Sequence, residues 1–167
     1  MNTNLPRNEP TKEELPLDRA QHFLRLLWRV NHVIEARSKQ MSVNLGITFQ
    51  QRTLLRLAGR FPGITAGRLA DTLHVDPGTI SAALGRLEGR GLLERTQDPH
   101  DRRRVRLWLT KKGHALNVPT SGTVESAVEK MISIVSANDL AIAESVLLAL
   151  VGAVDDLPMA RYEGETE

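Results

Sequence analysis

A cluster of arginines in a turn-rich stretch, residues 97–104, carries the most specific chemistry in this sequence. A guanidinium stays charged at every physiological pH and presents a planar fork of donors, which suits phosphate oxygens. Two carboxylates, Asp98 and Asp101, share the stretch, and we expect them to cap turn N–H groups and pair with a neighbouring arginine. Such a loop is a shaped basic tip for a polyanion, and the alternative is a solvated basic loop without a partner. Its arginines are Arg102, Arg103 and Arg104.

A second candidate site is the segment 76–90, which opens with an acidic residue followed by proline. Asp76 at the N-cap and Pro77 at the first helical position predict a helix start. Small outward residues would let this helix approach the floor of a DNA major groove, where hydroxyls and arginines bond base edges or phosphates. The alternative is that these are ordinary exposed residues of a small domain. The candidate DNA contacts are Pro77, Gly78, Thr79, Ser81, Ala82 and Arg86.

The helix that precedes this segment is short. Residues 65–74 combine a capping Thr65 with a small apolar face, and a tight turn leads from them to the helix at 76–90. Two helices joined in this way form a helix-turn-helix pattern. The second of them is the recognition helix.

The period of the apolar residues changes after Gly91. Residues 92–96 and 105–109 predict two strands, the second with alternating apolar and polar side chains. A β-hairpin directly after a helix-turn-helix is a wing. The arginine cluster at 97–104 would then form the wing tip.

Amphipathic helices flank this predicted domain on both sides. Their apolar stripes exceed what a lone winged domain needs, which predicts a partner subunit. Pro119 and Gly122 are expected to kink or interrupt the C-terminal helices. The expected fold class is mainly α with a small β-hairpin wing. In order, the segments are a flexible arm at 1–16, dimerisation helices at 17–45 and 114–157 around a winged helix-turn-helix domain at 46–113, and an acidic tail at 158–167.

Charge is distributed unevenly along the chain. Residues 86–114 carry nine basic and four acidic side chains, a net of +5, whereas residues 115–167 carry two and nine, a net of −7. Residues 1–85 carry eleven basic and seven acidic side chains, a net of +4. A polyanion would therefore be attracted to the middle of the chain and repelled from its end.

Composition excludes several protein classes. The chain has no cysteine, which excludes disulfides, thiolate metal sites and a thiol-based redox switch. We expect no apolar run to approach the roughly 20 residues of a membrane span. The polar N-terminus, with three early prolines, does not resemble a signal peptide. The sequence predicts a cytoplasmic protein without a membrane partner.

An enzyme is the competing class, and it would use the histidine and aspartates near 98–101. No second ligand cluster, serine or cysteine nucleophile motif, or phosphate-binding loop accompanies them. The sequence therefore predicts no catalytic residue, no metal, no cofactor and no enzymatic activity. A small hydrolase or metal-dependent enzyme stays as the alternative.

The run 91–113 resembles the wing segment of the MarR family of winged helix-turn-helix regulators. Asp101-Arg102-Arg103 matches the Asp-x-Arg wing motif of that family, and Leu109-Thr-Lys-Lys-Gly113 matches its Leu-Thr-x-x-Gly helix start. The resemblance implies a homodimer held by the first and last helices, with two winged lobes on a pseudo-palindromic operator. It also implies that Arg103 enters the minor groove while Thr79 and Ser81 face bases.

The sequence departs from the family pattern in a few places. Ala82 stands where the family often has a basic residue, and Pro119 and Gly122 fall where it usually has a long unbroken helix. The absence of cysteine excludes the peroxide-sensing branch of the family.

The resemblance further implies a repressor that a small aromatic or phenolic ligand releases from DNA. The alternatives are a winged-helix module for DNA architecture or protein interaction without a specific operator and, for the ligand cleft, ordinary packing residues. The residues that would line the cleft are Trp28, His32, Phe49 and Arg52.

Overall fold

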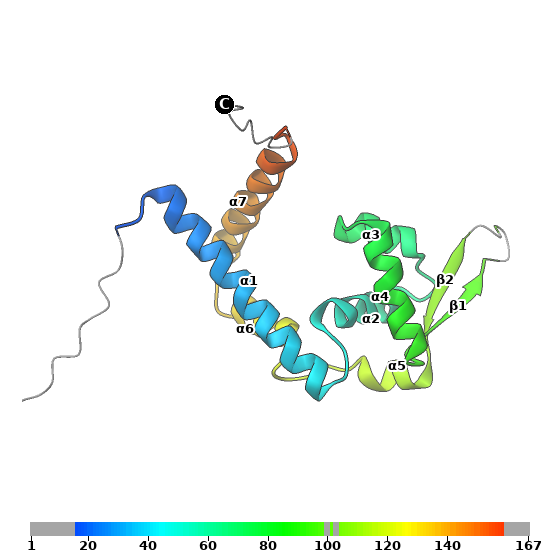
Figure 1. The fold of residues 1–167 in the computed structure, drawn as a ribbon. Helices are drawn as coiled ribbons and strands as arrows, with labels where there is room; N and C mark the ends of the chain where they lie inside the picture. Colours follow the sequence, from blue (N-terminus) through cyan, green and yellow to red (C-terminus); the bar gives the residue numbers. More distant parts are fainter. Residues whose placement is uncertain (1–15, 99–100, 102–103, 159–167) are drawn as a thin grey trace, which may run out of the picture. The chain divides into compact units, whose positions relative to one another are not determined.

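A computed structural model describes residues 16–98, 101 and 104–158 of the 167-residue chain. Nearly all of the predicted N-terminal arm and acidic tail lies outside these residues. The chain divides into two compact units, Met1–Phe49 and Gln50–Glu167, and each is described by itself. The mainly helical fold with one small hairpin agrees with the sequence-based prediction (Figure 1). Its elements are α1 (Arg19–Asn44), α2 (Phe49–Arg60), α3 (Ala66–Leu73), α4 (Pro77–Gly89), β1 (Leu93–Gln97), β2 (Val105–Leu109), α5 (Lys111–Leu116), α6 (Val124–Ile132) and α7 (Ala137–Asp155).

The first unit is built around α1. Asp18 caps this helix, because its carboxylate accepts from the backbone N–H of Gln21 at 2.8 Å, while the Gln21 side chain accepts from the N–H of Asp18 at 3.1 Å. Most of its large apolar side chains are exposed within the single chain, and Trp28 is 70% exposed. An apolar surface of this kind predicts a covering partner. The exposed set is Phe23, Leu24, Leu26, Trp28, Val30, Val33 and Val43.

The helix-turn-helix lies in the second unit. Thr65 caps α3 by accepting from the N–H of Arg68 at 3.2 Å, as predicted. His74 ends the helix in the left-handed region at φ 50°, and the N–H of Val75 then donates to the carbonyl of Ala70 at 3.1 Å. The turn is thus closed by main-chain bonds before α4 begins.

A leucine-rich core holds α2, α3, α4 and the hairpin together. These side chains are almost completely removed from water, and each buried leucine or isoleucine contributes about 1.5–3 kcal/mol. The core therefore fixes the recognition helix relative to the hairpin. Its most buried apolar members are Leu54, Leu55, Leu69, Ile80, Leu84, Leu87 and Leu107.

The end of α4 leads directly into the hairpin. The N–H of Gly91 donates to the carbonyl of Glu88 at 2.8 Å, and the N–H of Leu92 donates to that of Leu87 at 3.0 Å. This is a Schellman motif, which requires the positive φ of 66° that Gly91 adopts. The motif turns the chain sharply from helix to strand.

The wing is an antiparallel pair in which Leu93 is paired with Leu109 and Gln97 with Val105. A short third segment joins it, because Thr65 forms a β-bridge with Arg106. The N–H of Gly63 donates to the carbonyl of Leu107 at 2.9 Å. The two-strand prediction is therefore extended by an edge segment that precedes α3.

The C-terminal helices are interrupted where Pro119 and Gly122 predicted a kink or an interruption. Helix α5 ends at Leu116, α6 starts at Val124, and Gly122 adopts a φ of 75° between them. Proline lacks the N–H donor that a continuous helix needs, and the left-handed conformation of Gly122 does not continue a right-handed helix. Residues 117–123 thus form a bend.

Helix α7 corrects one expectation from the sequence. It is 19 residues long and contains an 18-residue window with a mean hydropathy of 1.6, so by length and composition alone α7 can cross a membrane, contrary to the expectation that no run approaches this length. None of its residues, all of which lie in the described part of the chain, is buried. A helix that packs against a partner protein passes the same test.

Candidate nucleic-acid interface

Helix α4 presents one buried and one exposed face. Asp76 caps it by accepting from the N–H of Thr79 at 3.0 Å, and Pro77 is its first residue, as predicted. The expected contacts Pro77, Gly78, Thr79, Ser81, Ala82 and Arg86 are all exposed.

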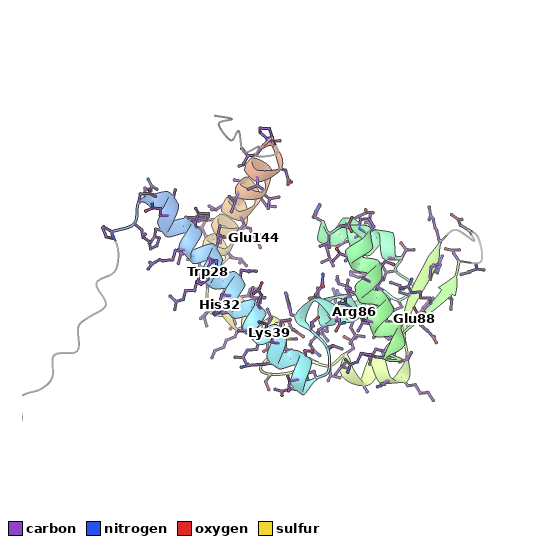
Figure 2. The ribbon with its side chains drawn as sticks, in the orientation of Figure 1. Trp28, His32, Lys39, Arg86, Glu88 and Glu144 are labelled. Carbon is purple, nitrogen blue, oxygen red and sulfur yellow. The ribbon has the colours of Figure 1, made fainter. Side chains whose placement is uncertain are left out.

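The exposed face of α4 carries small side chains that project little from the helix backbone. Gly85 lies on the same stripe as Ser81 and Ala82, and a Cβ atom there would meet no atom within 4 Å. Gly85 was not among the contacts predicted from the sequence, although its helical spacing from Ser81 places it on that side. Arg86 directly follows Gly85 on α4, is also exposed and supplies a positive charge (Figure 2). Such a surface can lie close to a nucleic-acid groove with an arginine at its side.

The hairpin flanks hold their carboxylates against arginines. Asp98 is buried and accepts from Nε of Arg106 at 2.8 Å, while Asp101 pairs with Nε of Arg104 at 3.2 Å. The N–H of Asp98 donates to the carbonyl of Arg104 at 2.9 Å, and the N–H of Arg104 donates to that of Asp101 at 2.9 Å. The carboxylates therefore fix both flanks of the hairpin end.

Two expected contacts, Arg102 and Arg103, lie outside the described residues, as does the neighbouring His100. Their assignment to DNA binding stays a prediction. In the described residues, no group of three or more histidine, aspartate or glutamate side chains is arranged to hold a metal ion.

The base of the hairpin is tied to the end of α4. The hydroxyl of Thr110 donates to the carbonyl of Gly91 at 2.6 Å, and Nζ of Lys112 donates to that of Arg90 at 3.0 Å. The N–H of Thr110 also donates to the carbonyl of Leu92 at 3.2 Å. These bonds hold the wing in a fixed relation to the recognition helix.

Gly113 makes this junction sterically tight. A Cβ atom at Gly113 would collide with the carbonyl oxygen of Leu92. We expect Gly113→Ala to lower the free energy of unfolding by about 1–3 kcal/mol, because the backbone must move apart. Thermal melting measures the loss. Gly67→Ala is the matched control, since its Cβ would meet nothing within 4 Å, and an equal loss in both variants would contradict the collision.

A basic hollow adjoins the hairpin. It has a volume of about 560 Å³ and lies between the start of α3 and the strands. Three arginines line it, and two of them, Arg68 and Arg95, were missed by the sequence analysis because they come from distant segments. Arg95 also pairs with Glu88 of α4 at 3.0 Å. The third arginine is Arg104, so the positive charge of the hairpin continues onto α3.

The residues expected to line a ligand cleft fall in different units. Trp28 and His32 stack on α1 with ring centroids 5.5 Å apart, and both are exposed (Figure 2). Phe49 is half-buried, and its N–H donates to the hydroxyl of Ser38 at 3.0 Å. The cleft itself stays a prediction.

Arg52, the fourth of these residues, has a different place from the one expected. It is completely buried within the second unit, where it pairs with Glu125 and donates to main-chain carbonyls of the 116–118 segment. A guanidinium with these partners serves the fold, and it lines no accessible surface. The helical spacing gave no signal of this contact because its partners lie more than 60 residues away.

The sequence and the fold of this chain are similar to those of known proteins of one family. Residues 45–104 match the sequence model of the MarR family. The chain is 33% identical over 82 residues to the transcriptional regulator HosA of Escherichia coli O111:H-, an alignment that covers 47% of this chain and 61% of HosA. It therefore spans less than two thirds of that relative.

Two further proteins are similar over more of their length. The chain is 27% identical to an HTH-type transcriptional repressor of Mycobacterium tuberculosis, covering 65% of this chain and 78% of the repressor. It also resembles Streptococcus pneumoniae FabT in complex with DNA, with a TM-score of 0.62 and 26% identity over 84% of this chain and all of FabT. HosA and the mycobacterial protein are named transcriptional regulators, and FabT was crystallised with DNA, in agreement with the DNA-binding regulator predicted from the sequence.

Proposed function

We propose that this chain is a winged-helix transcriptional regulator of the MarR family, whose sequence model matches residues 45–104, and that it acts as a homodimeric, sequence-specific DNA-binding repressor. One observation carries the proposal. The exposed face of α4, with its small side chains, and the arginine-bearing hairpin are held together. One core joins them, as do the hydrogen bonds of Thr110 and Lys112. A rigid pair of this kind suits a duplex with a helix in one groove and a hairpin over the adjacent one.

Each part has a distinct role in the proposed complex. Residues 76–90 enter the major groove, where Thr79 and Ser81 meet base edges and Arg86 meets bases or phosphate. The wing at 97–104 lies along the minor groove, where a guanidinium benefits from the focused negative potential. The carboxylates Asp98 and Asp101 orient the hairpin and do not face DNA.

A second copy of the chain is the proposed partner for the apolar helices. α1 and α7 expose large apolar side chains along their length, and a homodimer would bury them. The acidic C-terminal third then lies away from DNA. We also infer a cytoplasmic location, because α7 is engaged by protein rather than by lipid.

Release from DNA by a small molecule completes the proposed function. The repressor assignment rests on the relative from Mycobacterium tuberculosis. A small aromatic or phenolic ligand is proposed because Trp28 and His32 offer an exposed stacked pair of rings.

Selection of bound sequences from random duplex DNA tests the proposal. We expect an inverted repeat with half-site centres about one helical turn, or roughly 34 Å, apart. Thr79→Ala and Ser81→Ala should change the selected bases within the half-sites, at a cost of about 1–3 kcal/mol for each lost base contact. Ser145→Ala, a serine on α7, is the control and should select the wild-type sequence. If no motif were enriched, an architectural module without a specific operator would replace this proposal.

A further inference from the structure

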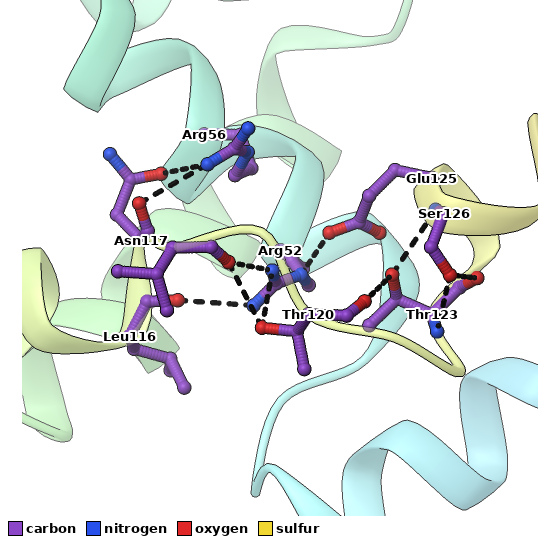
Figure 3. A network of polar contacts seen from close by, with 9 residues as sticks. Arg52, Arg56, Leu116, Asn117, Thr120, Thr123, Glu125 and Ser126 are labelled. Carbon is purple, nitrogen blue, oxygen red and sulfur yellow. Dashed lines mark hydrogen bonds and ion pairs between the residues drawn. The ribbon is translucent and has the colours of Figure 1, made fainter. Parts of the chain in front are cut away.

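The bend at 117–123 is held in shape by two arginines from α2. Arg52 and Arg56 reach from that helix to the main chain of the bend, and Glu125 of α6 closes the group (Figure 3). All of these residues belong to the second unit. The group joins the winged body to the helices that follow it.

Arg52 specifies the path of the bend at several successive points. Its guanidinium donates to the carbonyl of Leu116 at 3.1 Å, to that of Val118 at 2.7 Å and to the hydroxyl of Thr120 at 3.2 Å. Its Nε pairs with Glu125 at the start of α6. A planar fork with fixed donor directions constrains the positions of its acceptors relative to one another.

Arg56 adds a second set of bonds one turn further along α2. Its guanidinium donates to both the carbonyl and the side-chain oxygen of Asn117, at 3.1 and 3.2 Å. Gly59 lies beneath this contact, since a Cβ atom there would collide with the side-chain amide of Asn117. The first residue of the bend is therefore fixed from two sides.

The far end of the bend is joined to α6. The hydroxyl of Thr123 donates to the carbonyl of Thr120 at 2.8 Å and accepts from the N–H of Ser126 at 3.2 Å, which caps the helix. Thr120 is therefore bonded both to Arg52 and to Thr123, the residue that caps α6. The direction of α6 is coupled through this chain of bonds to α2.

The burial of Arg52 indicates that its hydrogen bonds define the conformation of the bend at 117–123. Arg52 is completely buried, and a buried ion pair is often no more stabilising than an apolar packing of the same volume. Directional hydrogen bonds to a loop main chain do define one conformation among several that apolar contacts would allow. The group is therefore suited to fixing the direction of α6 relative to α2.

We propose that Arg52 and Arg56 are positioning residues that set the separation of the two recognition helices, and thereby the half-site spacing that the dimer accepts. The proposal rests on the homodimer proposed above. In that dimer, α4 is held in the winged body while α7 follows α6, so the bend controls the geometry between DNA-contacting and dimerising parts. Neither arginine contacts DNA in this scheme.

The test uses the full-length protein and duplexes that carry the selected inverted repeat with its centre shortened or lengthened by single base pairs. Arg56→Ala and Glu125→Gln each remove one anchor, and both leave Arg52 in place so that the core stays filled. Arg60→Ala is the matched control, because Arg60 is an exposed arginine of α2 stacked on Phe61. Binding to a duplex with a single half-site and thermal melting report whether each lobe is intact.

We expect the wild type and Arg60→Ala to prefer one spacing. In Arg56→Ala and Glu125→Gln, the ratio of the affinity for the preferred spacing to that for the altered spacings should fall roughly tenfold, which corresponds to the coupling typical of such networks. The affinity for a single half-site should stay within about twofold of the wild type. A merely structural role would lower all affinities together. Unchanged spacing profiles in both variants would overturn this inference alone, whereas selection of single half-sites by the wild type would overturn the homodimer and this inference together.

Discussion

Two glutamates placed on α7, by Leu147→Glu and Val151→Glu, are expected to reduce operator affinity by roughly 10²- to 10⁴-fold. Both side chains are about half exposed in the single chain and lie one turn apart on the same face. The substitutions therefore cost the monomer little, but they would place uncompensated charges in a dimer interface. In the dimer, binding of one protomer raises the effective concentration of the other protomer at the second half-site. Loss of the dimer removes this gain, because the second protomer must then bind from solution. Sedimentation and operator titration measure the two effects.

The control places the same charges at polar positions of the helix, Asn138→Glu and Ser145→Glu. Both positions are exposed, and this variant should stay dimeric with operator affinity close to the wild type. If the Leu147→Glu, Val151→Glu protein sedimented as a dimer, α7 would not form the interface. If the wild type floated with lipid vesicles, this would instead indicate that the apolar helix α7 binds a membrane.

Arg103→Ala is expected to weaken operator binding by about 10- to 100-fold, which is the loss of about 1–3 kcal/mol from one groove contact. The described flanks of the wing are held by the Asp98–Arg106 and Asp101–Arg104 pairs. Arg103→Lys should recover part of the affinity, since it keeps the charge without the guanidinium fork.

Gel-shift titration at constant salt measures this loss, and Arg60→Ala serves again as the exposed control. Wild-type affinity for Arg103→Ala would remove the wing from the mechanism. Equal affinities of the lysine and alanine variants would instead show that the fork, rather than the charge, carries the contact.

Local signals in the sequence were sufficient for most of the winged domain. Asp76-Pro77 predicted the start of α4, because the cap and the residues it serves are three positions apart. The cap of α3 by Thr65 was also predicted, and so was a kink or interruption near Pro119 and Gly122, since each depends on nearby backbone geometry. The alternation at 105–109 located the second strand for the same reason.

Features that depend on distant partners were missed. The edge segment that pairs Thr65 with Arg106 joins residues 41 positions apart, and no local period indicates it. Arg52 was expected at a ligand cleft because the family resemblance implies one, and no local signal indicated that this charged residue is buried. Its acceptors are main-chain carbonyls of a bend, which leave no mark on side-chain identity. Arg68 and Arg95 likewise meet only through the tertiary fold.

We propose that a dimer of this chain binds one DNA sequence specifically through α4 and the wing. Competition at physiological salt between the selected inverted repeat and a scrambled duplex of the same length and composition tests this proposal. We expect the operator to be bound at least about 10³-fold more tightly, with two protomers on each duplex. Equal affinities for the two duplexes, or one protomer on each operator, would contradict it.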